Sequence, residues 1–110
     1  MANLHYWILM SYMLKIEVHE FASLEFDEAI EWYESQAKGL GKRFKNEVVK
    51  RIKSAQNNPS WYPQESKNLH MLYIPKFPYK VIFTFTSTHL TIWAICHLHR
   101  KPRYWKSRIK

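Results

Sequence analysis

The stretch Phe26-Asp-Glu-Ala-Ile-Glu-Trp-Tyr-Glu-Ser-Gln-Ala-Lys-Gly-Leu-Gly-Lys-Arg-Phe44 holds the larger part of one amphipathic helix, a glycine break and the start of a second helix. Apolar residues recur at helical spacing from Ala22 to Ala37, and acidic residues occupy the rest of that circumference. After Gly39-Leu-Gly41 the same spacing returns from Phe44 to Ala55, now with lysines and arginines on the outer face. The sequence therefore predicts a helical hairpin with opposite charge on its two exposed sides.

Segments with strand character lie on both sides of this hairpin. Met13 to His19 alternates in the manner of a half-buried strand, and β-rich runs follow the hairpin at residues 69–74, 79–86 and 90–99. Pro59 ends the second helix, and Ser87-Thr-His89 offers a short turn, so the last two runs are expected to pair antiparallel. The order predicts an α+β domain of the form β-α-α-β-β-β, with the helical hairpin packed on an antiparallel sheet.

Size and cysteine content limit the organisation of the chain. Its 110 residues allow one domain, which we assign to residues 13–110. Residues 1–12 are expected to form an N-terminal extension or an added strand. The apolar run at residues 4–14 lacks a basic flank and is too short to span a bilayer, so no membrane association is expected. The single Cys96 cannot form an internal disulfide, which indicates a reducing, cytoplasmic setting.

Charge is distributed unevenly along the chain, whose formal net charge is +8. Residues 1–37 hold seven acids and one base, residues 38–65 hold seven bases and two acids, and residues 66–110 hold nine bases and no acid. One end of the protein is therefore acidic, and the other attracts polyanions. This asymmetry favours nucleic acid or an acidic protein as the partner.

The last fourteen residues, His97-Leu-His-Arg-Lys-Pro-Arg-Tyr-Trp-Lys-Ser-Arg-Ile-Lys110, combine two histidines, six cations, a tyrosine and a tryptophan. Arginine and lysine bind phosphate, aromatic faces stack on bases, and a histidine can move a proton near neutral pH. Trp105 and Ile109 are four residues apart and are expected to pin this segment as a short basic helix or tail against the domain. The tail is the part of the sequence best suited to meet a phosphate backbone.

Five short patterns occur in order along the chain: Glu28-Ala-Ile-Glu-Trp-Tyr-Glu34, Gly39-Leu-Gly41 followed by Phe44, Asn58-Pro59, Phe77-Pro-Tyr79 and His97-x-His-Arg-Lys-Pro-x-Tyr-Trp105. Together they resemble the pattern of the RelE/ParE toxin superfamily over about residues 13 to 108. The resemblance implies a β-α-α-β-β-β fold and a toxin of a type II toxin-antitoxin pair, neutralised by a small antitoxin encoded alongside it. It also implies two alternative mechanisms. RelE-type members cut mRNA in the ribosomal A site, and ParE-type members poison DNA gyrase.

Two positions depart from this family pattern. His70 stands near a place where family members often carry arginine, so a phosphate-binding role there is expected to be weaker. Arg103 follows Pro102 where a Pro-Gly pair is common, which adds charge and removes a flexible turn. A non-toxic nucleic-acid-binding relative, a decayed toxin, is therefore a third alternative.

RNA cleavage of the RelE kind needs groups that move protons and groups that neutralise the extra charge on the phosphorane. On an extended strand His97 and His99 would point to the same side, about 6.5–7 Å apart, and either could serve as base or acid. Arg100 or Arg103 could neutralise the phosphate, and Tyr104 could stack on a base or donate a proton. A position at the rim of the sheet, without catalysis, is the alternative for the histidines. The opposite face of that strand would consist of Leu90, Ile92, Ala94, Cys96 and Leu98.

Further basic residues are candidates for nucleic-acid contacts: Lys76, Lys80, Lys101, Arg103, Lys106 and Arg108. No metal and no other cofactor is expected, because Cys96 would point away from the histidines on a strand. The leading hypothesis is a growth-inhibiting toxin that cleaves ribosome-bound mRNA, with gyrase poisoning second. The expected partners are an acidic antitoxin and either the ribosome with mRNA or DNA gyrase.

Overall fold

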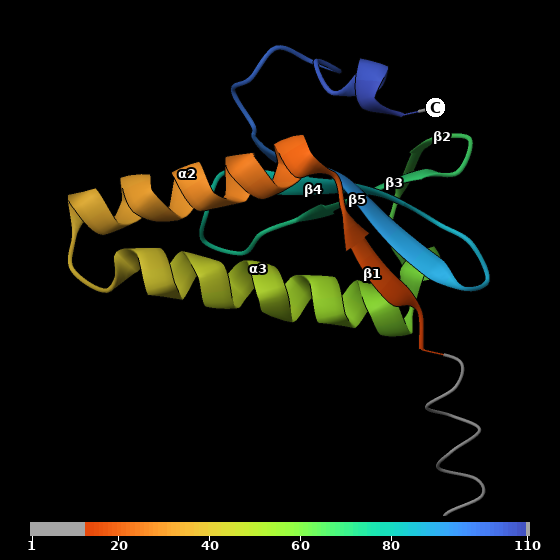
Figure 1. Cartoon of the computed structure of the whole chain (residues 1–110), viewed down its shortest axis with the longest axis horizontal. Helices are drawn as coiled ribbons and strands as arrows, with labels where there is room; N and C mark the ends of the chain where they lie inside the picture. Colours follow the sequence, from red (N-terminus) through yellow and green to blue (C-terminus); the bar gives the residue numbers. More distant parts are fainter. Residues whose placement is uncertain (1–12, 110) are drawn as a thin grey trace, which may run out of the picture.

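Two antiparallel helices cover one face of a five-stranded sheet (Figure 1). The computed structural model describes residues 13–109, so the expectations for residues 1–12 lie outside it. Helix α2 spans Glu20–Gln36 and helix α3 spans Leu40–Asn57, which confirms the helical hairpin. A short 3-10 turn, Pro59–Trp61, follows α3 at the proline expected to end it. Within the described residues, no helix is long and apolar enough to cross a membrane.

The glycine break fixes the geometry of the hairpin. Gly39 has a φ of +86°, a left-handed conformation that glycine adopts without strain. Gly41 is needed for space, since a Cβ atom there would lie 2.6 Å from the carbonyl oxygen of Ile30. The carboxylate of Glu34 accepts the backbone N–H groups of Gly39 at 2.9 Å and Gly41 at 3.0 Å. Glu34 therefore satisfies free donors at the start of α3 and places a negative charge at its positive end.

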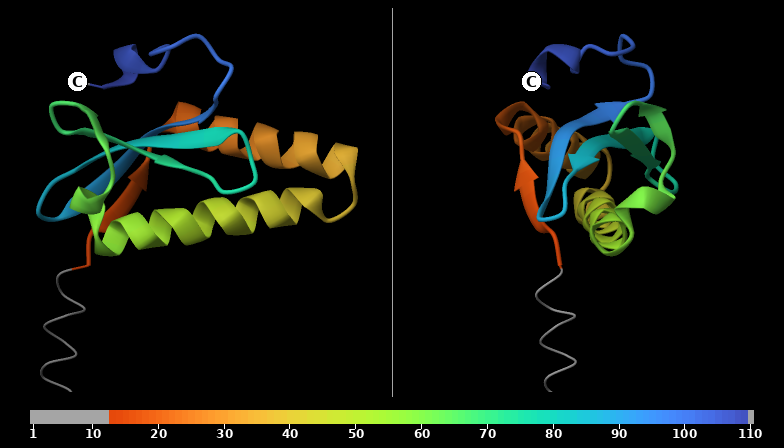
Figure 2. Two further views of the ribbon diagram at one scale, coloured as in Figure 1. Left: turned by 180° about the vertical axis from the view of Figure 1, so that it is seen from behind. Right: turned by 90° about the vertical axis from the view of Figure 1, so that its right-hand side faces the viewer.

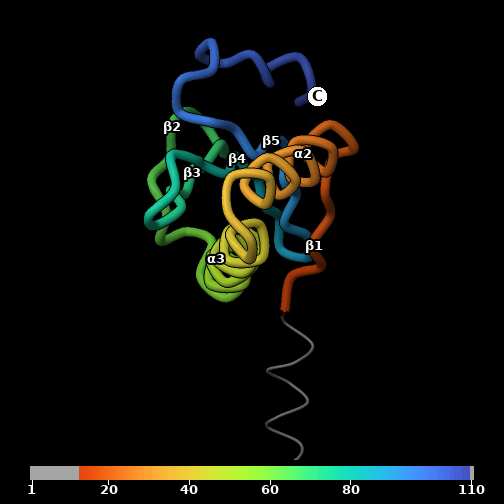
Figure 3. The backbone as a smooth tube through the Cα atoms, turned by 90° about the vertical axis from the view of Figure 1, so that its left-hand side faces the viewer, coloured from red at the N-terminus to blue at the C-terminus, as the bar shows by residue number. Residues whose placement is uncertain are grey.

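The sheet is mixed, and its order is β1-β5-β4-β3-β2. Figure 3 shows β1 at one edge and β2 with β3 at the other. Neighbours from β2 to β5 are antiparallel, but β1 is parallel to β5, so the expectation of a wholly antiparallel sheet is wrong for β1. A parallel neighbour needs a long crossover connection, which the helices and the intervening strands provide. The strand bounds are β1 Lys15–Val18, β2 Gln64–Ser66, β3 Leu69–Tyr73, β4 Tyr79–Phe85 and β5 His89–His97.

Strand β2 is not among the strands expected from the sequence. It has three residues, and its register with β3 is irregular. Asn68 lies in the turn between the two strands with a φ of 63°, a left-handed conformation that asparagine tolerates. Because β2 carries no alternation of apolar residues, hydrophobic periodicity cannot reveal it.

A bulge between β4 and β5 reverses the alternation along β5. The register skips Trp93, which is the extra residue on β5. Beyond it, Ile95 packs in the cluster under the helices, whereas Ala94 and Cys96 pack on the opposite face. The expected apolar face through residues 90, 92, 94, 96 and 98 is therefore wrong beyond Ile92, because strict alternation cannot account for an inserted residue.

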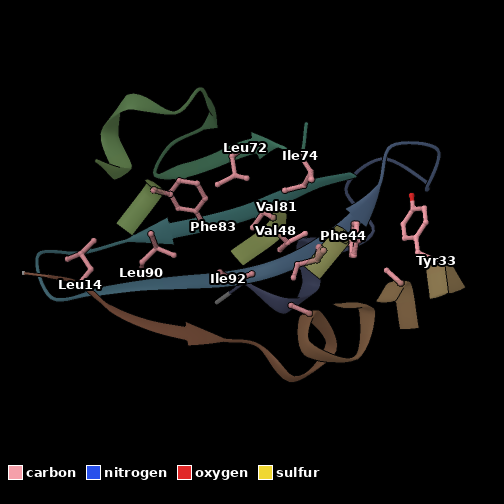
Figure 4. Packing of buried hydrophobic residues seen from close by; sticks show 14 residues of the cluster. Leu14, Tyr33, Phe44, Val48, Leu72, Ile74, Val81, Phe83, Leu90 and Ile92 are labelled. Carbon is pink, nitrogen blue, oxygen red and sulfur yellow. The ribbon is translucent and has the colours of Figure 1, made fainter. Parts of the chain in front are cut away.

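Each face of the sheet buries its own cluster of apolar side chains. The larger cluster lies between the sheet and the helices and includes Phe44, Val48 and Phe83, all fully buried (Figure 4). The smaller cluster, on the other face, includes Ile82 and Trp105. Figure 2 (right) shows α3 and the C-terminal tail on opposite sides of the strands. The tail therefore supplies part of a second layer over the sheet.

We expect Gly41→Ala to lower the free energy of unfolding by about 1–3 kcal/mol, because the added methyl group would meet a backbone carbonyl oxygen. Urea unfolding followed by circular dichroism measures this loss. Gly39→Ala is the matched comparison, since its Cβ would meet nothing within 4 Å and only the left-handed backbone is strained, at about 1–2 kcal/mol. A Gly41→Ala protein as stable as the wild type would contradict the close approach of the two helices.

Candidate functional site

The C-terminal tail folds back over the sheet face opposite the helices. Strand β5 ends at His97, turns follow, and Lys106–Arg108 form a single 3-10 turn. Trp105 is 1% exposed and packs in one cluster with Ile82, and Ile109 packs against that cluster. The expectation that Trp105 and Ile109 pin a short basic helix is confirmed in the form of this turn.

One carboxylate holds the tail to α2 and β5. Glu25 accepts two hydrogen bonds from the guanidinium of Arg108, at 2.9 Å from Nη1 and 3.0 Å from Nη2. It also accepts the hydroxyl of Tyr104 and, at 3.1 Å, the backbone N–H of Ile95. Arg108 donates further to the carbonyl of Trp93 at 3.0 Å. The side chains of Arg108 and Glu25 are only 11% and 14% exposed, so water screens this pair weakly.

Two expected site residues are engaged inside the protein by this carboxylate. The guanidinium of Arg108 lies in the ion pair with Glu25 and not at the open surface, which leaves it less available for a nucleic-acid contact. Burial raises the pKa of the Tyr104 hydroxyl far above its usual range, and the hydrogen bond to Glu25 raises it further. Tyr104 therefore stays protonated at neutral pH, with its proton directed at Glu25. The partners are 79 and 83 residues apart, a separation that no sequence motif records.

The two histidines of the tail region lie close together. Their ring centroids are 5.1 Å apart, and the ring of His97 also meets Tyr79 edge-on at 5.2 Å. His97 is half-buried and His99 is exposed. The expectation that both lie on an extended strand is wrong, because β5 ends at His97 and the backbone N–H of Arg100 closes a turn onto the carbonyl of His97. The turn nevertheless brings the two rings together.

Hydrogen bonding distinguishes the two rings. The backbone N–H of His99 donates to Nδ1 of His97 at 3.0 Å, so a neutral His97 carries its proton on Nε2. Among the described residues, no hydrogen bond engages the ring of His99. His99 is therefore the ring whose two nitrogens are open to a substrate, and His97 is a donor through Nε2.

Cations border His97 on one side, whereas a hollow on its other side is lined by Glu25 and Glu28 of α2 together with Arg100. The guanidinium of Arg100 lies 4.1 Å from the ring centroid of Tyr104, which holds it by a cation-π contact. A hollow of about 70 Å³ borders Arg100. Lys101 and Arg103 are exposed beside it, and Lys80 is half-buried. The residues that the structure brings to this hollow include Lys80, His97, Arg100, Lys101, Arg103 and Tyr104.

The remaining two candidate cations are exposed at separate places. Lys76 lies in the β3–β4 turn with a φ of 70° and shares a hollow with Arg43 and Glu47 of α3. Most of its neighbours in this hollow belong to α3, so Lys76 lies apart from the tail cations. Lys106 lies on the 3-10 turn and lines a different groove of the tail face, together with Arg103.

His70 is buried, at 7% exposure. Its ring stacks on Phe83 with 5.5 Å between centroids and 19° between planes, and its Nδ1 lies 3.0 Å from the carbonyl oxygen of Tyr62. A carbonyl oxygen only accepts, so this nitrogen carries a proton. The structure gives His70 a packing role, which is consistent with the expectation that any phosphate contact at this position is weakened.

Arg103, the other departing position, has a φ of 62°, in the left-handed region. Glycine adopts this conformation freely, whereas a residue with a Cβ is strained there by about 1–2 kcal/mol. The tail therefore keeps a sharp turn at Arg103 and presents an exposed cation on it.

Cys96 is buried on the tail side of the sheet. Burial raises the pKa of its thiol to about 11, so the thiol is protonated at neutral pH and is a poor nucleophile and metal ligand. Its Sγ donates to the carbonyl of Lys80 at 3.7 Å. Within residues 13–109, no group of three or more His, Cys, Asp and Glu side chains is placed to hold a metal ion.

We expect Glu25→Gln to lower the free energy of unfolding by about 2–4 kcal/mol, because it leaves the shielded guanidinium of Arg108 without a counter-ion. Thermal unfolding measures the change. Glu31→Gln, at an exposed glutamate of the same helix, is the matched control and should alter stability by less than about 0.5 kcal/mol. Similar melting temperatures for both variants would contradict the role assigned to Glu25.

Comparison with known proteins shows a shared fold. The chain is similar to a chain of a solved structure described as "Chromosomal ParDE TA system from P. aeruginosa", where TA denotes toxin-antitoxin. The TM-score is 0.63 at 20% sequence identity, and the match covers 79% of this chain and 98% of that chain. No family model matches the sequence, and no curated protein matches it. The similarity confirms the fold that the RelE/ParE resemblance implies.

Proposed function

We propose that this protein is the toxin of a toxin-antitoxin pair and that it inhibits growth in the cytoplasm by cleaving ribosome-bound mRNA. The observation that carries the proposal is the cluster after β5, where two histidine rings lie 5.1 Å apart next to the exposed Arg100. The fold shared with a chain of a ParDE system supports the toxin assignment. The absence of acids from residues 66–110 of the sequence supports a polyanionic target.

His97, His99, Arg100 and Tyr104 each have a role in the proposed cleavage reaction. The 2′-hydroxyl oxygen attacks the adjacent phosphorus, and the bond from phosphorus to the 5′ oxygen breaks. His99 takes the 2′-hydroxyl proton, and the departing 5′ oxygen takes a proton from water. Arg100 neutralises the charge that builds on the phosphorane, while His97 donates its Nε2–H to a phosphate oxygen. Tyr104 acts through its ring, which positions Arg100.

Gyrase poisoning is the second candidate, and one observation favours it. The similar solved structure belongs to a ParDE system, and ParE-type members of the superfamily that the sequence resembles poison gyrase. In that mechanism a protein surface is recognised, and proton transfer by His99 is not needed. A non-toxic relative that binds nucleic acid would show neither activity.

After induction in a sensitive host, His99→Ala and Arg100→Ala are each expected to reduce mRNA cleavage by about 10²–10⁴-fold, because each removes a reacting or charge-stabilising group and little packing. Lys53→Ala, at an exposed lysine of α3, is the matched control and is expected to cleave like the wild type. Primer extension on a reporter mRNA measures the new 5′ ends, with a gyrase cleavage assay in parallel. DNA breaks with intact mRNA would contradict the RNase mechanism, and neither effect from folded protein would favour the non-toxic alternative.

The proposed antitoxin carries an acidic, amphipathic segment that lies across the helical hairpin or the sheet edge, close to the tail. The tail face offers cations to its acids. Exposed apolar side chains of α2 offer contacts to its apolar face: Phe21, Leu24 and Trp32 are 49%, 54% and 57% exposed. A disordered acidic chain could fold onto this surface and mask the tail.

Co-expressed with the product of a small neighbouring gene, the protein is expected to form a soluble and non-toxic complex. Its affinity should fall as salt rises, because ionic contacts between exposed groups are screened. Isothermal titration calorimetry at two salt concentrations measures this dependence. A neighbouring gene product that neither binds nor restores growth would contradict the toxin assignment.

A further inference from the structure

A second and larger groove lies on the tail face beside the hollow at Arg100. Its volume is about 480 Å³. The β2–β3 turn contributes Lys67 and Asn68, the end of β4 contributes Thr84, and the tail contributes Arg103 and Lys106. Segments far apart in the sequence thus build one concave surface. None of these five residues takes part in the proposed cleavage chemistry.

The charge of this groove is of one sign. Lys67, Arg103 and Lys106 are exposed at its wall, and no acidic residue is among the described residues that line it. These cations come from two sides, the β2–β3 turn and the tail. A negatively charged chain lying in the groove would therefore meet cations on both sides.

Trp93 gives the groove an aromatic wall. It is the extra residue of the β5 bulge, and its indole Nε1–H donates to Oγ1 of Thr84 at 2.8 Å. This hydrogen bond fixes the orientation of a half-buried ring that lines the groove. Because the ring is already held in one orientation, stacking a base on it costs little conformational entropy of the protein, and the affinity is higher for that reason.

The groove lies next to the hollow that His97 and Arg100 line. Arg103 and Trp105 line both, so the two sites are adjacent. A single strand could occupy both by passing Arg103. The bases of a duplex are paired and stacked, so a duplex could not place a base on Trp93. An acidic peptide would gain less binding free energy than a single-stranded RNA from a fixed aromatic ring flanked by Asn68 and Thr84, because it has no base to stack there.

We propose that this groove binds the single-stranded RNA next to the cleaved bond, with a base on Trp93 and phosphates on Lys67, Arg103 and Lys106. The inference rests on the proposed RNA target, and it adds the site that holds the flanking nucleotides. Binding here would position the strand so that the scissile phosphate lies at Arg100.

The test measures binding of a labelled single-stranded RNA of about 12 nucleotides to the whole protein by fluorescence anisotropy, without ribosomes. Lys67→Ala and Lys106→Ala are each expected to weaken binding about 3- to 10-fold and to reduce the salt slope by about 0.7. Trp93→Leu is expected to weaken it about 5- to 150-fold, whereas Trp93→Phe retains a stacking face and should stay within about threefold of the wild type. Lys53→Ala on α3 is the matched control for lost charge and should show the wild-type affinity.

Circular dichroism melting establishes that each variant is folded, and the two lysine variants test the groove without changing its packing. RNA affinity that is unchanged in Lys67→Ala, Lys106→Ala and Trp93→Leu would overturn the proposal. So would equal losses in Lys53→Ala and the groove variants, since binding would then follow net charge alone. A glutamate-rich peptide that binds these variants more weakly than the wild type, while RNA does not bind, would assign the groove to an acidic protein instead. If the groove variants lose RNA binding and the wild-type protein leaves mRNA intact in the host, the groove is confirmed as an RNA-binding site and only the proposed cleavage activity is refuted.

Discussion

The carboxylate of Glu25 is the contact on which the position of the tail depends. It belongs to α2, yet it accepts hydrogen bonds from the amide of Ile95 in β5 and from the side chains of Tyr104 and Arg108. Those donors are 70 to 83 residues away in the sequence. One side chain therefore joins the helical layer, the sheet and the tail, beyond the point where the pairing of β1 with β5 ends at Ile92. Packing of Trp105 against the sheet supports the same arrangement from the other side of the tail.

The same contact decides which tail groups remain available to a partner. Arg108 and the hydroxyl of Tyr104 turn inward, and the charge of Glu25 is neutralised inside the ion pair. Arg100, Lys101 and Arg103 stay exposed. The bulge places Trp93 at the groove on this face, while His97 and His99 lie at the edge where β5 ends. A fold shared with a ParDE chain thus presents cations and an aromatic ring on the tail face, next to the end of β5, where His97 packs on Tyr79, and this arrangement is the physical basis of the proposed RNA target.

Hydrophobic periodicity is sufficient to predict both helices, the hairpin and the order of the main strands, because each depends on residues close in sequence. The spacing of Trp105 and Ile109 also predicts that the tail packs on the domain, but not which strand residues it meets. Periodicity could not give the parallel pairing of β1, since it does not identify strand neighbours. The bulge at Trp93 is not predictable from alternation, and its one inserted residue moves every later side chain of β5 to the opposite face of the sheet. In the candidate site, the composition of the last fourteen residues is enough to identify the cations and the two histidines. The inward turn of Arg108 and the burial of His70 depend on Glu25 and Phe83, which lie in other elements.

The central claim is that the tail, held by Glu25, gives the sheet a face that meets single-stranded RNA. Amide and indole correlation spectra of ¹⁵N-labelled protein, recorded during titration with RNA, test this claim most directly. The account predicts that the Trp93 indole and the amides of Lys67 and residues 100–106 shift, while the amides on the outer face of α3 do not. Shifts confined to the basic face of α3, with Trp93 and the tail unchanged, would contradict it.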